Sequence, residues 1–122
     1  MDRKILQART KQFHVDVIKL CEQFPRNAAG FETAKQVIRS AGSVGANYRA
    51  TKRAKSDKDF IYKIEIVLEE ADESHYWLEV VRDSGIKIGE EVDRLIKEAN
   101  ELTAIFTATD KTAKANRNGS ST

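Results

Sequence analysis

Hydrophobic residues recur at helical spacing in four separate stretches of the chain, and no stretch alternates in the way a β-strand does. The first stretch predicts a helix from about Arg3 to Phe24, ended by Pro25. The second predicts a helix from residues 31–33 to about Lys52. One apolar face of each helix is expected to contact the core. The first face carries Ile5, Leu6, Phe13, Val17, Leu20, Cys21 and Phe24, and the second carries Ala34, Val37, Ile38, Ala41, Val44, Gly45 and Tyr48.

The third stretch predicts a long helix that begins after Ser56 and ends near Ser84 and Gly85. Ser56 is a typical N-cap, and Asp59, three residues later, completes a capping box. Two apolar stripes run along this helix: Phe60, Ile64, Val67, Leu68, Ala71, His75 and Leu78 form the first, and Tyr62, Ile66, Trp77 and Val80 form the second. A monomeric bundle needs only one stripe, so the second indicates contact with another subunit.

Tyr76 and Trp77 are adjacent on this third helix, so their side chains cannot both point into the same core. At least one of the two is therefore expected at the rim between helices or at a subunit boundary.

The fourth stretch begins at Glu90 and Glu91 and carries the most regular stripe of the chain. That stripe contains Val92, Leu95, Ile96, Ala99, Leu102, Ile105 and Phe106. From Asp110 the periodicity is lost and the composition is polar, which predicts a disordered tail over residues 110–122 after a helical domain over residues 1–109. Four amphipathic helices joined by short loops predict an all-α, up-down-up-down antiparallel four-helix bundle.

The composition bears on the cellular location of the protein and on the distribution of charge along the chain. The 122 residues suffice for one core without a disulfide, and the single cysteine, Cys21, excludes an internal one. No apolar stretch approaches a membrane span and the N-terminus lacks a signal sequence, so a cytoplasmic protein is expected. The net charge is +2, but residues 33–63 hold eight Lys and Arg against two Asp, whereas residues 64–83 hold seven carboxylates against one Arg. This asymmetry predicts either a polyanionic partner or a second copy of the chain.

The positive charge is densest after Tyr48, and this segment is the best candidate for contact with nucleic acid. The cations are Arg49, Lys52, Arg53, Lys55 and Lys58. They could neutralise several phosphates of RNA or DNA in a salt-dependent way, without reading base sequence. The alternative is a solvated or subunit-contacting helix end, where cations are favoured by the helix dipole.

Small residues precede this basic segment at Ala41, Gly42, Ser43, Gly45 and Ala46. Glycine costs about 1 kcal/mol relative to alanine inside a helix, so two glycines predict close approach of another helix. On that view Gly45→Ala is expected to be neutral or destabilising. Asn47 follows, and its amide is expected either to bond a neighbouring helix and fix the register or to bind a ligand.

No motif predicts catalysis, a cofactor or a metal, and we expect a protein that is not an enzyme and has no small-molecule substrate. Asp72 and His75 stand at the i, i+3 spacing of di-iron bundles, but a second carboxylate–histidine pair is missing because His14 has no Glu three residues before it. His75 is instead expected at the edge of the core, bonded to Asp72 or to the backbone. Cys21 is expected to be a core thiol.

The run RSAGSVGAN at residues 39–47, followed by SDKDFI at 56–61 and EEADESHYWL at 69–78, resembles the 23S rRNA-intervening sequence protein family. The resemblance covers residues from about Phe13 to Phe106. It implies an up-down four-helix bundle that assembles into a ring-like homo-oligomer, most often a homopentamer. A more distant relative, the accessory protein of diversity-generating retroelements, is a basic pentamer that works with nucleic acid. Many members have Ala-Glu-Gly where this chain has Arg49-Ala50-Thr51, so this helix end is more basic.

The resemblance and the residues together yield one functional hypothesis and one alternative. The hypothesis is an oligomeric adaptor that binds RNA or DNA backbones through the cations at residues 49–58. The alternative is a protein-interaction scaffold whose basic segment is used in subunit contacts. Helix packing or subunit contact is expected for Ala41, Gly42, Gly45, Asn47, Tyr62, Ile66, Tyr76 and Trp77.

Overall fold

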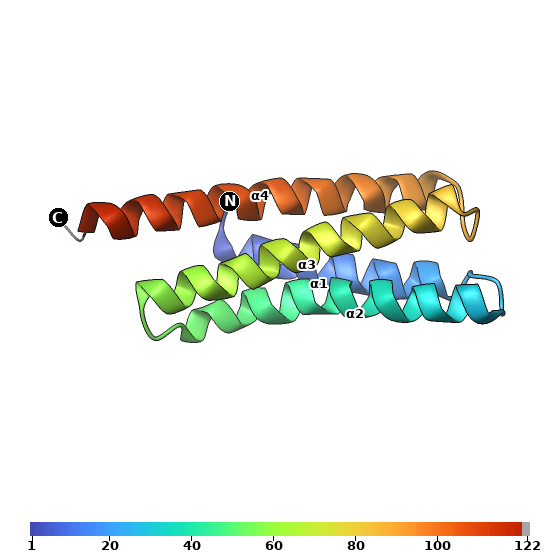
Figure 1. The fold of residues 1–122 in the computed structure, drawn as a ribbon, viewed down its shortest axis with the longest axis horizontal. Helices are drawn as coiled ribbons and strands as arrows, with labels where there is room; N and C mark the ends of the chain where they lie inside the picture. Colours follow the sequence, from blue (N-terminus) through green and yellow to red (C-terminus); the bar gives the residue numbers. More distant parts are fainter. Residues whose placement is uncertain (121–122) are drawn as a thin grey trace.

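The computed structural model describes residues 1–120, which form a bundle of four helices with antiparallel neighbours (Figure 1). Helix α1 spans Arg3–Cys21, α2 spans Ala28–Ala50, α3 spans Asp57–Asp83 and α4 spans Glu90–Ser120, with a 3₁₀ turn, η1, at Thr51–Arg53. Within the described residues there is no strand. Contacts are extensive between α1 and α2, α2 and α3, and α3 and α4, and sparse between α1 and α4. The predicted all-α bundle is confirmed.

The first connection lies about three residues earlier in the chain than the sequence predicts. Helix α1 already ends at Cys21, and α2 begins at Ala28, before the expected start at residues 31–33. The side chain of Asn27 caps α2 by accepting a hydrogen bond from the Gly30 N–H at 2.9 Å. Gly30 is buried, and a Cβ there would lie 2.1 Å from the Pro25 carbonyl oxygen, so only glycine allows the loop to pack back onto the helix.

Helix α3 begins and ends where the sequence predicts. The Ser56 hydroxyl accepts a hydrogen bond from the Asp59 N–H at 3.0 Å. The Asp59 carboxylate accepts from the backbone N–H of Lys55 at 3.0 Å, one residue earlier than a standard capping box would place the bond. After α3, Gly85 adopts a φ of 77°, a left-handed conformation that glycine reaches without steric cost.

The core follows the predicted stripes, with additional buried residues on α3. Ile61, Ser74 and Val81 are buried there as well, and His75 is partly buried, in line with the expected place at the edge of the core. Its Nδ1 lies 3.4 Å from the carboxylate of Glu79 rather than near Asp72. On α1, the expectation for Ile5 is wrong, since its side chain is 59% exposed. The other predicted faces are buried or packed against the buried cluster.

Helix α4 continues through most of the segment expected to be disordered, and its end projects beyond the other helices (Figure 1). Asp110 is buried, and its carboxylate pairs with Lys114 one turn later at 3.0 Å. Lys114 also reaches Glu65 of α3 at 3.0 Å. These contacts extend the packing of α4 on α3 past Phe106, so the loss of apolar periodicity at residue 110 does not end the helix. Residues 121–122 of the expected tail lie outside the described residues.

Candidate nucleic-acid interface

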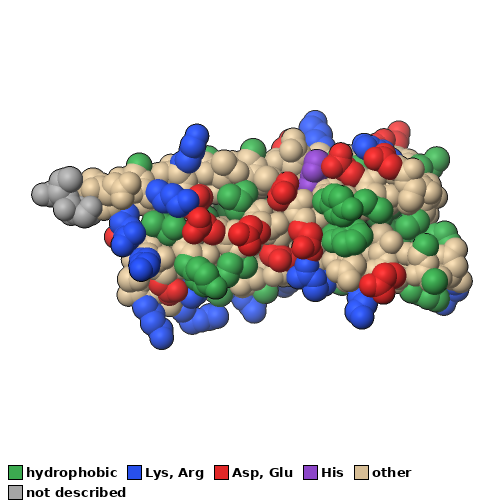
Figure 2. Space-filling view, viewed as in Figure 1, with side chains coloured by type: hydrophobic (Ala, Val, Ile, Leu, Met, Phe, Trp, Pro, Cys, Tyr) green, Lys and Arg blue, Asp and Glu red, His purple; other side chains and the backbone are tan. Residues whose placement is uncertain are grey.

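The predicted cations surround the turn that joins α2 to α3, at one end of the bundle. All five side chains are exposed, and within residues 1–120 none of them forms an ion pair. They are Arg49 in the last turn of α2, Lys52 and Arg53 in η1, Lys55 in the loop, and Lys58 in the first turn of α3. Figure 2 shows lysines and arginines gathered toward this end and carboxylates in a band along the middle of the visible face. We call these five residues the basic end.

Thr51 sets the direction of the side chains in η1. It is buried, its hydroxyl donates to the Tyr48 carbonyl oxygen at 2.6 Å, and its Oγ1 accepts from an Arg3 guanidinium nitrogen at 2.6 Å. Because Thr51 points inward, the following Lys52 and Arg53 project into solvent.

Arg3 has a structural role beside this turn and does not add to the basic end. Its guanidinium lies 5.1 Å from the centre of the Tyr48 ring, within the range of a cation–π contact. The Tyr48 ring packs on Phe106 of α4, with ring centroids 5.4 Å apart, and burial raises the pKa of the Tyr48 hydroxyl. This cluster ties the ends of α1 and α2 to α4.

One carboxylate beside the basic end, Asp59, is engaged by groups of its own chain. Asp59 accepts from the Lys55 backbone N–H, and its Oδ1 pairs with the Lys63 ammonium at 3.0 Å. These two contacts, the backbone hydrogen bond first, lower the pKa of Asp59. The ammonium groups of Lys55 and Lys58 form no ion pair within residues 1–120.

Helix α1 adds cations that the sequence argument missed. Lys4 and Lys11 are exposed and line a surface hollow together with Lys52 of η1. No sequence signal marks them, because they lie about forty residues before Lys52 and only the antiparallel packing of α1 on α2 brings them together.

A second hollow, the α1–α2 groove, adjoins the first and has a volume of about 280 Å³. It is lined by Gln7, Lys11, His14, Gly42, Gly45, Ala46 and Arg49. A Cβ at Gly42 would lie 2.8 Å from Nε2 of His14, and a Cβ at Gly45 would lie 3.4 Å from the Thr10 carbonyl oxygen. Gly42 thus leaves room for the His14 ring, and both glycines line an open groove that also carries Lys11 and Arg49.

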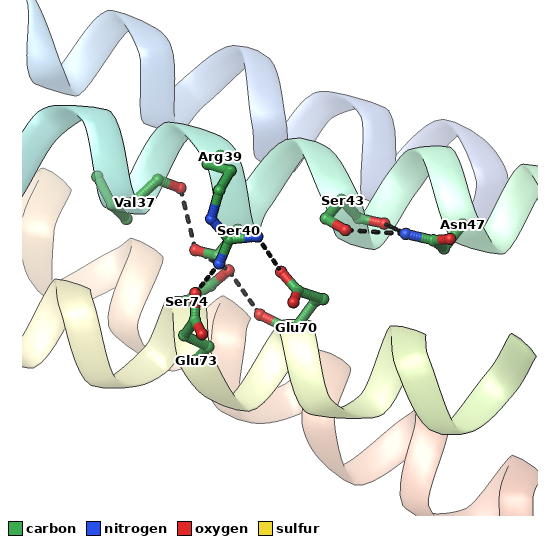
Figure 3. A network of polar contacts seen from close by, with 8 residues as sticks. All are labelled: Val37, Arg39, Ser40, Ser43, Asn47, Glu70, Glu73 and Ser74. Carbon is green, nitrogen blue, oxygen red and sulfur yellow. Dashed lines mark hydrogen bonds and ion pairs between the residues drawn. The ribbon is translucent and has the colours of Figure 1, made fainter.

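On its other side, α2 meets α3 in a seam closed by polar contacts (Figure 3). The buried Ser74 hydroxyl can donate to Ser40 Oγ at 2.9 Å or to the Glu70 carbonyl oxygen at 2.8 Å. Above this pair, the Arg39 guanidinium bonds the carboxylates of Glu70, at 3.1 Å, and Glu73. Part of the opposite charge of the basic and acidic segments is thus neutralised within one chain.

Ala41 packs between helices as expected, whereas Asn47 does not bond a neighbouring helix. Ala41 is fully buried in the core. The amide of Asn47 donates to the carbonyl and hydroxyl oxygens of Ser43, both at 2.8 Å, within its own helix (Figure 3). The expected bond from Asn47 to a neighbouring helix is therefore wrong.

Tyr62 is the exposed member of the second apolar stripe of α3, whereas Ile66 and Val80 are partly buried; Tyr76, which is not part of that stripe, is exposed as well. Tyr62 is 62% exposed and Tyr76 is 57% exposed, with the partly buried Ile66 between them in the sequence. Trp77 instead packs against the core, and its ring meets that of Tyr76 edge-on at 5.2 Å. Only Trp77 of the adjacent aromatic pair turns inward, as the helical geometry predicts.

The described residues offer little for chemistry other than binding. Burial raises the pKa of the Cys21 thiol to about 12, which keeps it protonated and weakly nucleophilic at neutral pH. In residues 1–120, no group of three or more His, Cys, Asp or Glu side chains could hold a metal ion. Nor does any helix in that range have the length and apolar character to cross a membrane.

The geometry defines a small helical bundle with a cationic end, and comparison with known proteins places it in a family. The family model described as 23S rRNA-intervening sequence protein matches residues 3–108, so the chain belongs to that family. The chain is similar to a crystal structure of a protein of unknown function from the S23 ribosomal protein family of Bacteroides thetaiotaomicron. That match has 29% identity and a TM-score of 0.82, and it covers 91% of this chain and 99% of the other. No curated protein matches the sequence.

Proposed function

We propose that this protein is a non-enzymatic, cytoplasmic adaptor that binds RNA or DNA backbones through the basic end. The observation that carries the proposal is the set of five exposed cations without an intramolecular ion pair in residues 1–120. Cations held apart from carboxylates keep their full attraction for phosphate, and each one that neutralises a phosphate releases a bound counterion.

The proposed binding is directed at the backbone and not at the bases. The basic end surrounds a turn between two helices, with no aromatic side chain among its five residues to stack on a base. Contacts of this kind fix position and register but carry no sequence information. Lys4 extends the positive surface along α1.

The proposal includes assembly into a closed ring of identical copies, five being the number implied by the family resemblance. The two exposed tyrosines of α3, Tyr62 and Tyr76, support a subunit contact, because exposed aromatic residues surrounded by charge mark interaction surfaces. A ring would repeat the basic end around one axis, and several weak sites that engage one nucleic acid together gain affinity through effective concentration.

A scaffold without nucleic-acid binding is the second candidate, favoured by one observation. Arg49 of the basic end also lines the α1–α2 groove, where a neighbouring subunit could use its charge. In that case the remaining cations of the basic end would serve solubility only.

Fluorescence anisotropy with a labelled RNA hairpin and a labelled DNA duplex, over a range of salt concentrations, tests the proposal. For a duplex, each lost phosphate contact should reduce the slope of log K against log salt by about 0.9. We expect Arg53→Gln and Lys55→Gln to weaken binding and flatten the slope. The matched control is Lys97→Gln, which removes an exposed cation of α4 outside the basic end. Equal binding by all variants, or no binding by the unaltered protein, would exclude nucleic-acid recognition here and favour the scaffold.

A further inference from the structure

We propose that the outer face of α3 in one copy docks against the α1–α2 groove of the next copy, with Glu69 opposite Lys11. This inference rests on the proposed assembly and names the two surfaces that make it. The occupant of the groove is a second copy of this chain.

The first argument is charge. The groove is lined by two cations, Lys11 and Arg49. The outer face of α3 presents Glu69 in a central position between the exposed Tyr62 and Tyr76. Within residues 1–120 neither Lys11 nor Glu69 forms an ion pair, so each lacks the partner that the other would supply.

The second argument is the height of these residues along the long axis of the bundle. Ser40 contacts Ser74 across antiparallel helices, so a residue five positions after Ser40 on α2 is level with one five positions before Ser74 on α3. Gly45 and Glu69 are those residues. On the other side of α2, a Cβ at Gly45 would lie 3.6 Å from the backbone nitrogen of Lys11. Lys11, Gly45 and Glu69 therefore share one level of the bundle.

This shared level matters because a rotation about an axis parallel to the helices moves no residue up or down. In a ring built around such an axis, Glu69 of one copy arrives at the level of Gly45 and Lys11 in its neighbour. The two surfaces lie on different sides of α2, so the contact is heterologous, and repeated rotation can close it into a ring. Tyr62 and Tyr76 would then flank the groove above and below the charged pair.

The test compares two charge reversals with their combination. Lys11→Glu and Glu69→Lys each place like charges in every interface, and we expect each to weaken association at least tenfold in sedimentation velocity at micromolar protein and low salt. The double variant restores opposite charges in every interface and should assemble again, which a misfolded protein could not do. Lys97→Glu, an exposed reversal on α4, is the matched control and should assemble normally.

An equimolar mixture of the two single variants sharpens the test. In a ring in which the two variants alternate, every interface again pairs opposite charges at positions 69 and 11. Half of the interfaces have the charges of the original protein, and the other half have both charges reversed. A ring with an even number of subunits should reassemble fully, whereas an odd-numbered ring keeps one mismatched interface and should reassemble less completely.

The possible failures are distinguishable. If the single variants assemble like the unaltered protein, or if the double variant stays dissociated, the proposed pairing of surfaces is wrong while ring assembly and nucleic-acid binding still stand. If the unaltered protein sediments as a 13.8 kDa chain, the assembly and this interface are both overturned. Loss of RNA affinity in Lys11→Glu with unchanged association would assign the groove to nucleic acid instead.

Discussion

Helix α2 has two seams, and they differ in how their polar groups are satisfied. Toward α3, Ser40 meets Ser74 in the core and Arg39 bonds two carboxylates (Figure 3). Toward α1, the helix presents two glycines, and the neighbouring Lys11 and Arg49 have no carboxylate partner in residues 1–120. The α2–α3 seam is closed by the chain itself, whereas the α1–α2 groove is left open.

The difference teaches that opposite charge along a sequence does not by itself indicate a partner. The acidic segment of α3 and the basic segment of α2 are neighbours in the bundle, and Arg39 uses two carboxylates of that segment internally. Lysine and arginine side chains that form no ion pair within residues 1–120 lie instead at the basic end and along α1. The open seam and the basic end are therefore the surfaces from which binding should be argued.

The largest expected effect is a difference in the free energy of unfolding between two variants, each of which places a leucine at one seam of α2. Ser40→Leu adds volume to a fully buried position, and overpacking of this kind costs about 1–3 kcal/mol. Ala46→Leu adds volume to an exposed position in the open groove and should change stability by less than about 0.5 kcal/mol. Urea unfolding on the Glu69→Lys background, where the proposed subunit contact is broken, measures both values. Equal costs at the two positions would contradict the distinction between the seams.

The hydroxyl pair of the closed seam should show a smaller, measurable coupling. Ser74→Ala removes a hydrogen bond worth about 0.5–1.5 kcal/mol. Ser40→Ala should cost less, because Ser74 then keeps the carbonyl oxygen of Glu70 as its acceptor. A double-mutant cycle by urea unfolding should give a coupling energy of about 0.5 kcal/mol or more, since residues in contact are not additive. Strict additivity would show that the two hydroxyls do not act as a pair.

The sequence predicts the four helices well because their signals are local. Ser56 caps α3, Gly85 ends it, and the stripe of α4 is buried as expected. Predictions fail at positions where the structure depends on a residue that is distant in the sequence. Ser74 is polar and was not expected in the core, yet Ser40 of another helix satisfies its hydroxyl. The continuation of α4 past Asp110 likewise depends on Glu65, which lies on α3 and receives Lys114.

Of the candidate site, the sequence predicted only the residues that lie close together along the chain. The five cations of the basic end lie within ten residues and could be recognised as one cluster. The groove could not, because it joins Lys11 and His14 of α1 to the glycines of α2 across some thirty residues of chain. Composition marks Gly42 and Gly45 as sites of close approach, but it does not show that the same glycines also border open space.

A third prediction concerns the floor of the open groove and revises the expectation from sequence. A Cβ at Gly45 would lie 3.4 Å from the Thr10 carbonyl oxygen, an ordinary contact distance. Gly45→Ala should therefore keep most of the gain in helix propensity, up to about 1 kcal/mol, and stabilise the chain. Thermal unfolding on the Glu69→Lys background should show a rise in Tm of a few degrees. A fall in Tm would mean that α1 lies closer to α2 than these distances indicate, and that the seam is closed at this point.

The smallest expected effect is a pH dependence at the start of α3, where the closed seam begins. The backbone N–H of Lys55 and the ammonium of Lys63 lower the pKa of Asp59 below its ordinary value of about 3.9. A carboxyl with a lowered pKa in the folded state stabilises the fold fully above its unfolded pKa, and this contribution is lost as the pH falls through the folded value. Asp59→Asn keeps an oxygen for the Lys55 N–H but cannot titrate, so its unfolding midpoint should fall less steeply than that of the unaltered protein as the pH is lowered below about 4. Parallel profiles in thermal unfolding would show that Asp59 is not held by these partners in solution, and its carboxylate would then be free to neutralise the cations of the basic end.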